Sequence, residues 1–246
     1  KCGIIDPEWA NIIQKLPQRV LIIRKNFQLC IPAEKYGIIY RKRKLEAYYM
    51  DILFGSTAVS ASKKEESRTL GLCRAFIEAY EKAHPQDRVS ELALEDEALS
   101  WMTAPRLNRR DGLIGKGDYD DELFCYARRF AQADKIIVGA PYWDKSFPAL
   151  LKVYIENVSV NGIAFHYTEN GPEGLCRARK LLYLLTCGGE IGQADSGIAY
   201  LQDVCDMFGI KAFDSIAAEG LDIEGADVKA LMEQACGEAR ALAELW

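Results

Sequence analysis

The chain has 246 residues, of which 49% are hydrophobic and 27% are charged, and its formal net charge at pH 7 is −5. These values are typical of a soluble globular protein that is long enough to bury one large hydrophobic core or two smaller ones. They exclude an intrinsically disordered chain, a collagen-like repeat and a coiled coil.

The first 49 residues differ from the rest of the chain in charge and in composition. They contain 10 Lys and Arg against 4 Asp and Glu, whereas residues 50–246 contain 21 against 32, a net charge of −11. Lys, Ile, Asn, Tyr and Phe, whose codons are rich in A and T, supply 22 of the first 49 residues but only 42 of the other 197. We therefore expect a single domain at residues 50–246 with its native start at Met50. Residues 1–49 are expected to be a basic extension that is disordered or is translated non-coding sequence.

An alternative is that this basic segment is a functional arm. The run Arg41-Lys42-Arg43-Lys44 could contact nucleic acid or anionic lipid. The longest apolar run of the segment, Val20–Ile23, is too short for a signal sequence or a membrane span. Because the rest of the chain is anionic, we expect it to have no nucleic-acid partner and no membrane association.

The eight cysteines do not form a recognisable metal-binding or redox pattern. No two of them are spaced as C-x-x-C, the close pairing that zinc ribbons, cysteine-ligated iron–sulfur clusters and thioredoxin-type redox sites require. We therefore expect no metal site, and we expect most of the cysteines to be buried thiols in a reducing cytoplasm.

From Met50 onward, strand and helix patterns alternate. Residues 50–55 form a short apolar strand that ends at a loop rich in Gly, Ser and Thr. Apolar residues then recur at helical spacing over residues 67–83, and residues 88–94 alternate as a second strand. The polar stretch that follows, through Asp121, is predicted to be mainly loop.

Three more strands are predicted in the second part of the chain. A helix at residues 124–133 precedes a strand at residues 135–140, which is apolar enough to be central in a parallel sheet. After a turn at residues 141–145, Ser146 is expected to cap a helix that has Pro148 in its first turn and runs to about Val160. The remaining elements are expected in the order strand, helix, strand and helix, at residues 180–186, 196–208, 212–217 and 226–245.

Five strands separated by helices predict an α/β fold, a doubly wound five-stranded parallel sheet with helices on both faces. In such a sheet, ligands bind beyond the carboxyl ends of the strands, at the point where the strand order switches direction. Three loops lie in that position, at residues 55–69, 141–147 and 186–190. The search for a functional site narrows to these loops.

The first loop suits a phosphate, because Ser67-Arg68-Thr69 stands at a helix start where hydroxyl groups, backbone N–H groups and a guanidinium can bind an anion. The alternative is a plain helix cap, and Ser62-x-x-Glu65 is itself a capping box. The chain contains neither the G-x-G-x-x-G motif nor a P-loop.

The other two loops suit a planar ring. Tyr142 and Trp143 could stack on such a ring, or they could cap the hydrophobic core. Gly188 and Gly189 follow a strand, where glycine either permits a turn or lets the backbone approach a ligand closely. Spacing alone does not separate these interpretations.

Four segments together resemble a known family. They are Ala140–Val158 (APYWDKSFPALLKVYIENV), Gly162–Leu175 (GIAFHYTENGPEGL), Thr186–Gly189 (TCGG) and Ala218–Leu221 (AEGL). They resemble the FMN-dependent NADH-azoreductase and quinone reductase family, and F-x-Y-T-E-N-G-P-E-G-L is the most specific part. The resemblance implies a flavodoxin-like fold for residues 50–246, with FMN as cofactor.

One bound FMN would account for all three loops. On the resemblance, its phosphate would be held by Ser56 or Thr57 and by Ser67, Arg68 and Thr69. Its ring would lie against Pro141, Tyr142, Trp143, Asp144 and Lys145, with Thr186, Cys187, Gly188 and Gly189 bordering the pyrimidine side. The family often has a Ser-x-Ser pair where this chain has Glu65-Glu66-Ser67, so Ser60-x-Ser62 is an alternative for the phosphate.

The resemblance also implies an activity. NADH or NADPH would deliver hydride to the flavin N5, and a quinone or azo compound would then take two electrons in the same space, in a ping-pong scheme that assigns no side chain a catalytic role. Phe147, His166 and Tyr167 would lie on the substrate side. The alternative for His166, which we favour over a role as proton donor, is a surface residue. A homodimer is implied, with each active site completed by the partner chain. A flavodoxin-type electron carrier that does not oxidise NAD(P)H is the alternative function.

Overall fold

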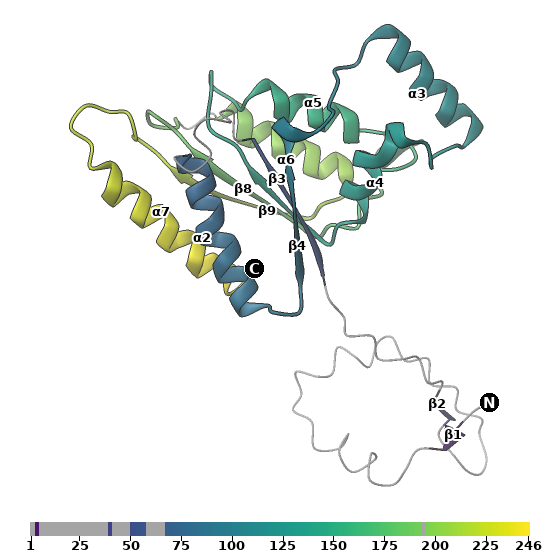
Figure 1. Ribbon diagram of the computed structural model, residues 1–246. Helices are drawn as coiled ribbons and strands as arrows, with labels where there is room; N and C mark the ends of the chain where they lie inside the picture. Colours follow the sequence, from purple (N-terminus) through teal and green to yellow (C-terminus); the bar gives the residue numbers. More distant parts are fainter. Residues whose placement is uncertain (1–2, 5–38, 41–49, 58–66, 193–194) are drawn as a thin grey trace. The chain divides into compact units, whose positions relative to one another are not determined.

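The computed structural model describes residues 3–4, 39–40, 50–57, 67–192 and 195–246 (Figure 1). The chain divides into two units, residues 1–48 and residues 49–246. In the first unit, β1 (Gly3–Ile4) and β2 (Ile39–Tyr40) form an antiparallel pair. Apart from this pair, the expectations for residues 1–49, including the Arg41–Lys44 arm, lie outside the described residues.

The second unit is built on the parallel five-stranded sheet that the sequence predicts. Its strands are β3 (Asp51–Ser56), β4 (Arg88–Ala93), β5 (Lys135–Gly139), β8 (Lys180–Thr186) and β9 (Ala212–Ala218). Their order is β4-β3-β5-β8-β9, and every neighbouring pair is parallel. β5 and β8 have a strand on each side and helices above and below, which explains why their sequences are almost entirely apolar.

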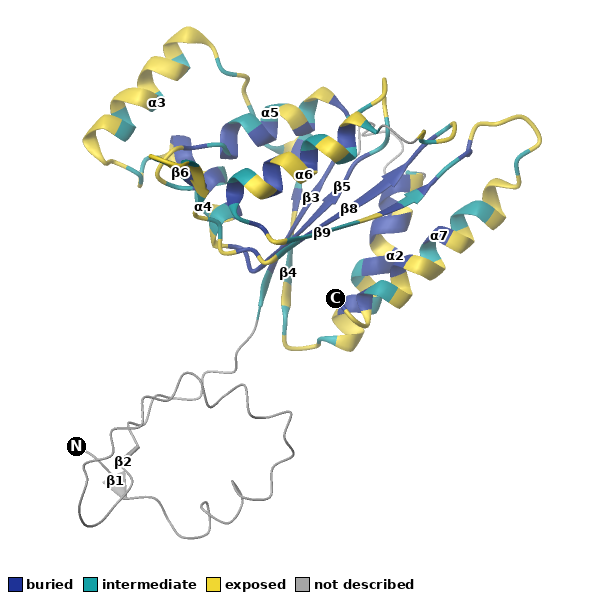
Figure 2. Ribbon diagram, turned by 180° about the vertical axis from the view of Figure 1, so that it is seen from behind, coloured by how far each residue is buried: buried dark blue, intermediate teal, exposed yellow. Residues whose placement is uncertain are grey.

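Helices cover both faces of the sheet (Figure 1, Figure 2). On one face lie α2 (Arg68–Ala83) and α7 (Val228–Ala243), and on the other lie α4 (Cys125–Gln132), α5 (Ala149–Val158) and α6 (Ser196–Phe208). The core accordingly has two main clusters, one that contains Phe76, Tyr80 and Trp246, and one that contains Tyr154, Tyr183 and Phe208. The fold prediction is confirmed.

One prediction is wrong, because the stretch through Asp121 is not mainly loop. It contains α3 (Ala104–Lys116) and the short 3₁₀ helix η3 (Leu94–Asp96), and a second 3₁₀ helix, η4 (Glu122–Phe124), follows directly after it. Thr103 caps α3 by accepting a hydrogen bond from the Arg106 N–H, and Gly117 ends it in the left-handed conformation. No residue of α3 is fully buried and few of its residues are large and apolar, so its apolar stripe, which includes Leu113 and Ile114, is narrow and hard to recognise in a sequence.

The start of α5 also differs from the prediction. The helix begins at Ala149 with Pro148 as its N-cap, and Ser146 does not cap it. Ser146 instead belongs to a tight turn, in which it exchanges backbone hydrogen bonds with Trp143. The sequence patterns also do not predict the hairpin of β6 (Phe165–Thr168) and β7 (Gly171–Gly174).

The described part of the chain lacks two further features. None of its helices combines the length and the apolar character that crossing a bilayer requires. Within the same residues, no group of three or more His, Cys, Asp or Glu side chains is arranged to hold a metal ion.

Candidate functional site

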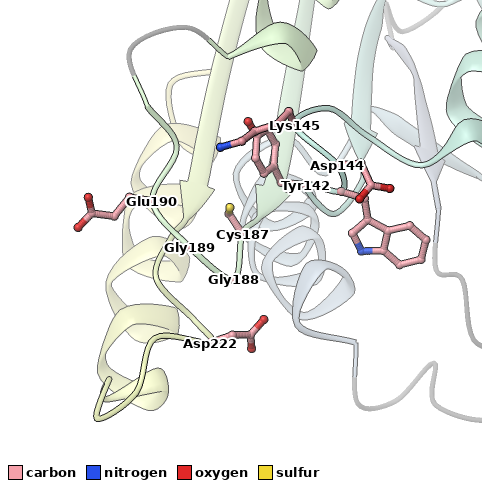
Figure 3. A pocket seen from close by; sticks show the side chains of 9 residues that line it. Tyr142, Asp144, Lys145, Cys187, Gly188, Gly189, Glu190 and Asp222 are labelled. Carbon is pink, nitrogen blue, oxygen red and sulfur yellow. The ribbon is translucent and has the colours of Figure 1, made fainter.

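The strand order places a switch point between β3 and β5. From β3 the chain crosses to β4 on one side, and from β4 it crosses to β5 on the other, so the loops after β3 and β5 diverge at this point. A pocket of about 550 Å³ lies at the carboxyl edge of the sheet (Figure 3). Its walls come from the loops after β5, β8 and β9, and they are formed by Tyr142, Trp143, Asp144, Lys145, Cys187, Gly188, Gly189, Glu190 and Asp222.

A strained turn forms the first wall. Asp144 and Lys145 have φ values of 51° and 68°, in the left-handed region that residues other than Gly, Asn and Asp disfavour, so Lys145 carries the strain. Trp143 and Ser146 close the turn by exchanging backbone hydrogen bonds of 3.0 and 2.8 Å, as in the two-residue turns of hairpins. The turn carries Lys145 to the same side of the pocket as Tyr142 (Figure 3). Backbone strain of this kind gathers at binding sites, where the surrounding structure maintains it.

The two glycines form the second wall, and each has a different reason to be glycine. A Cβ on Gly188 would lie 2.4 Å from Asp222 Oδ2, so a side chain here would displace the loop after β9. A Cβ on Gly189 would meet no heavy atom within 4 Å. Gly188 therefore permits the close approach of Asp222, whereas Gly189 faces open space.

Backbone hydrogen bonds fix the glycine loop against the loop after β9. The N–H groups of Leu221 and Asp222 donate to the carbonyl oxygens of Cys187 and Gly188, at 3.1 and 2.8 Å, and the Gly220 N–H donates to Gly189 O at 2.9 Å. The two loops therefore form one continuous wall.

Among the described residues that line the pocket, no ionisable side chain is an activated nucleophile. Burial raises the pKa of the Cys187 thiol, and Glu219 and Asp195 act in the same direction. Burial likewise raises the pKa of the Tyr142 phenol, again with Asp195 contributing. Both groups are therefore neutral at pH 7, and Cys187 is a buried packing residue at the base of the pocket.

The start of α2 lies beside the end of β8. Ser67 caps α2 by accepting a hydrogen bond from the Leu70 N–H, and the hydroxyls of Thr69 and Thr186 are 2.6 Å apart and buried. The guanidinium of Arg68 donates to Asp222 and to the Leu221 carbonyl. The residues predicted to contact the phosphate and those predicted to contact the ring therefore lie at the same edge of the sheet.

Ser56 and Thr57 do not line the pocket. Both are buried, and their hydroxyls donate to Glu91 Oε1 and to Gly139 O at 3.4 and 3.5 Å. The alternative pair Ser60 and Ser62, with the capping box, lies outside the described residues.

Comparisons with known proteins point to one family. A family model described as "Flavodoxin-like fold" matches residues 56–243. The FMN-dependent NADH:quinone oxidoreductase 2 of Clostridium perfringens is 37% identical over 181 residues, which are 73% of this chain and 91% of that protein. The chain belongs to the FMN-dependent NADH:quinone oxidoreductase family. A second relative of the same name, from Clostridium acetobutylicum, is 35% identical over 74% of this chain and 94% of its own.

A solved structure of this fold agrees with the family. The azoreductase of Bacillus anthracis is similar with a TM-score of 0.71 and 25% sequence identity, over 80% of this chain and all of that one. The resemblance of the four sequence segments to azoreductases and quinone reductases is thereby confirmed.

The residues of the pocket fit FMN, the cofactor in the family's name. Gly189 leaves open space at the wall, and Trp143, which also lines the pocket, is 47% exposed and free to contact a planar ring. A volume of about 550 Å³ lies within the usual range for small-molecule sites. The start of α2, with no acidic residue in its first turn, supplies the dipole end that favours a phosphate.

The predicted substrate-side residues do not join this pocket within one chain. Phe147 packs on Tyr200, with ring centroids 5.6 Å apart. His166 and Tyr167 lie on the β6–β7 hairpin, where Phe165 packs 6.3 Å from Phe208 at the end of α6. Because α6 runs from the carboxyl edge to the amino edge of the sheet, this hairpin lies at the opposite edge from the pocket.

Sequence reasoning misses Asp222. It follows Ala218–Leu221, a segment that carries the family resemblance, and it comes after the last strand of the sheet. The rule that places ligands at the carboxyl ends of strands applies to that strand as well, and it could have identified this residue.

Proposed function

We propose that this chain binds FMN in the pocket of Figure 3 and passes electrons from NADH or NADPH to quinone or azo compounds. The observation that carries this proposal is the pocket itself, where an aromatic turn and an open glycine wall meet at the carboxyl edge of the sheet. The relatives named FMN-dependent NADH:quinone oxidoreductase and the similar azoreductase structure support it.

The protein's own residues bind and orient the cofactor. FMN, when bound, supplies the two-electron chemistry. Tyr142 and Trp143 would cover the ring, while Gly189 allows it to approach the backbone. The Lys145 ammonium lines the pocket and, although it is exposed to water, would favour negative charge on the ring. Ser67, Arg68 and Thr69 stand at the α2 start, where the phosphate would bind.

The donor and the acceptor would use the same space in turn. Both the nicotinamide and the acceptor would have to reach the ring in the pocket of about 550 Å³ beside the glycine wall, so we expect the nicotinamide to leave before a quinone or azo compound binds. This order of events is a ping-pong mechanism. Initial rates measured against NADH at several fixed quinone concentrations should give parallel double-reciprocal lines, and lines that intersect would contradict the mechanism.

The alternative function is a flavodoxin-type electron carrier. The net charge of −11 on residues 50–246 is compatible with it, since such carriers are usually acidic, whereas the resemblance over residues 141–175 favours the reductases. The two functions differ in one property, which is whether NADH reduces the bound FMN without another protein.

We further propose a homodimer in which the β6–β7 hairpin of each copy reaches the pocket of the other. Tyr167 is 70% exposed and lies far from the pocket of its own chain, so a second copy gives it a role. Sedimentation equilibrium should show two chains, and a monomer would contradict this arrangement. Mixing Gly189→Val with Tyr167→Ala should restore activity that each homodimer lacks, because one of the two sites in the mixed dimer is intact.

The proposed location is the cytoplasm. The six described cysteines are all free, which suits a reducing compartment. Cell fractionation tests this location, and recovery of the protein with secreted proteins would contradict it.

A further inference from the structure

Arg68 and Asp222 connect three segments at the edge of the pocket. Arg68 is the first residue of α2, and its Nη2 donates to Asp222 Oδ1 at 2.9 Å while its Nη1 donates to Leu221 O at 3.1 Å. The Asp222 N–H donates to Gly188 O at 2.8 Å. The other carboxylate oxygen of Asp222, Oδ2, lies against Gly188, only 2.4 Å from where a Cβ would stand. One carboxylate therefore contacts both α2 and the glycine loop.

This geometry gives Arg68 a different role from the one that the resemblance implies. A phosphate ligand at the start of α2 would direct its guanidinium toward the helix N-terminus. Arg68 instead directs two of its N–H groups to the loop of residues 221–222, which forms a wall of the pocket. Its charge is already matched by a carboxylate, which weakens its net attraction for a phosphate.

We propose that Arg68 and Asp222 are positioning residues for the flavin ring and that Arg68 is not a phosphate ligand. The pair holds residues 221–222 against Gly188, so that the wall formed by the two loops is already in place when the ring binds. The inference rests on the proposed function, because it takes FMN to be the ligand of the pocket.

The expected contribution is modest. The side chains of Arg68 and Asp222 are 44% and 66% exposed, and exposed ion pairs contribute little. Loss of the pair should therefore weaken flavin binding by about two- to fivefold. Because the wall borders the ring, riboflavin, which lacks the phosphate, should be affected as much as FMN.

The test is a flavin titration of the full chain after removal of its cofactor, followed by flavin fluorescence. FMN and riboflavin are each titrated into wild type, Arg68→Gln, Asp222→Ala and the double variant. Arg240→Gln is the matched control, because Arg240 forms a similarly exposed ion pair with Glu233 on α7, at 3.4 Å. Thermal unfolding of each protein verifies that the variants fold like the control.

The proposal predicts that each single variant lowers the affinities for FMN and for riboflavin by the same factor. The double variant should bind each flavin no more weakly than the single variant with the lower affinity. The charge-swapped protein, Arg68→Asp with Asp222→Arg, should recover part of the affinity, and the effect should shrink at high salt.

Two results would overturn the proposal. If Arg68→Gln weakens FMN and leaves riboflavin unchanged, Arg68 is a phosphate ligand. If neither ligand responds to any variant, the pair has no positioning role. A wild-type protein that binds neither flavin would instead overturn the proposed function together with this inference, so the two failures are distinguishable.

Discussion

The backbone N–H of Tyr142 donates to the carbonyl oxygen of Thr186 at 2.8 Å, which attaches the turn after β5 to the end of β8. The aromatic wall and the glycine wall of the pocket are therefore held at a fixed separation by the sheet itself. A ring bound between them would meet surfaces that are already positioned, which lowers the entropy lost on binding.

Gly189→Val should abolish or strongly weaken FMN binding without unfolding the protein. A Cβ at this position meets no heavy atom within 4 Å, so the valine methyl groups would occupy open space at the pocket wall. Gly112→Val is the control, because Gly112 also faces open space but lies in α3. FMN titration and thermal unfolding check both variants. Unchanged FMN affinity in Gly189→Val would mean that the ring binds elsewhere.

Gly188→Val should behave differently, because its side chain would collide with Asp222. The loop after β9 must then move, so we expect a lower melting temperature together with weaker FMN binding. A melting temperature equal to that of wild type would contradict the close contact between Gly188 and Asp222.

Lys145→Asn should stabilise the protein and weaken FMN binding at the same time. Lys145 adopts φ 68°, which asparagine tolerates better, so the free energy of unfolding should rise by about 0.5–1 kcal/mol. The loss of the ammonium should reduce FMN affinity. Lys211→Asn, a change at an exposed lysine before β9, should produce neither effect. Urea unfolding and FMN titration measure both quantities, and a destabilised Lys145→Asn variant would contradict the strained turn.

Cys187 should react slowly with iodoacetamide at pH 7. Burial raises its pKa, so the reactive thiolate is scarce at neutral pH, whereas Cys125 is exposed. Mass spectrometry of peptides after timed alkylation should find Cys125 modified first. Equal modification rates for the two residues in folded protein would show that Cys187 is more accessible than its burial indicates.

Tyr183→Phe should reduce the loss of stability at alkaline pH. Burial raises the pKa of Tyr183, so above about pH 10 the unfolded state releases a proton that the folded state retains, and the free energy of unfolding falls as the pH rises. Below that pH the tyrosine is neutral in both states, so it does not change the free energy of unfolding with pH. Urea unfolding at several pH values should show a shallower decline for Tyr183→Phe than for wild type.

The same variant should not be destabilised at pH 7. The Tyr183 hydroxyl is buried, and the described residues offer it no hydrogen-bond partner, so phenylalanine removes a polar group that gains nothing from its position. A loss of several kcal/mol at pH 7 would indicate a partner for this hydroxyl.

The sheet and most helices could be predicted from the sequence because buried elements have a regular pattern of apolar residues. β5 and β8 are buried along nearly their whole length and therefore appear as apolar runs. The pattern of α3 is weaker, since none of its residues is fully buried, and its capping residues Thr103 and Gly117 were the stronger signal. Helix ends are determined by caps as well as by periodicity. An exposed helix has weak periodicity, so its ends must be located from its caps alone.

The site was predictable in part. The loops after β5 and β8 meet at one edge because strand order requires it, and both line the pocket. The contact between Arg68 and Asp222 joins residues 154 positions apart, which no local pattern reveals. The left-handed backbone of Asp144 and Lys145 is equally hidden, because lysine does not favour it and aspartate adopts it only occasionally. Ser146 belongs to this turn and therefore does not cap α5.

The most direct test of the central claim is anaerobic mixing of the FMN-loaded protein with NADH, followed by addition of a quinone. The account predicts that NADH bleaches the flavin absorbance without any other protein and that the quinone restores it. Gly189→Val should retain no flavin to bleach. A wild-type protein that binds no FMN, or that holds FMN which NADH does not reduce, would contradict the account, and the second result would favour the electron carrier.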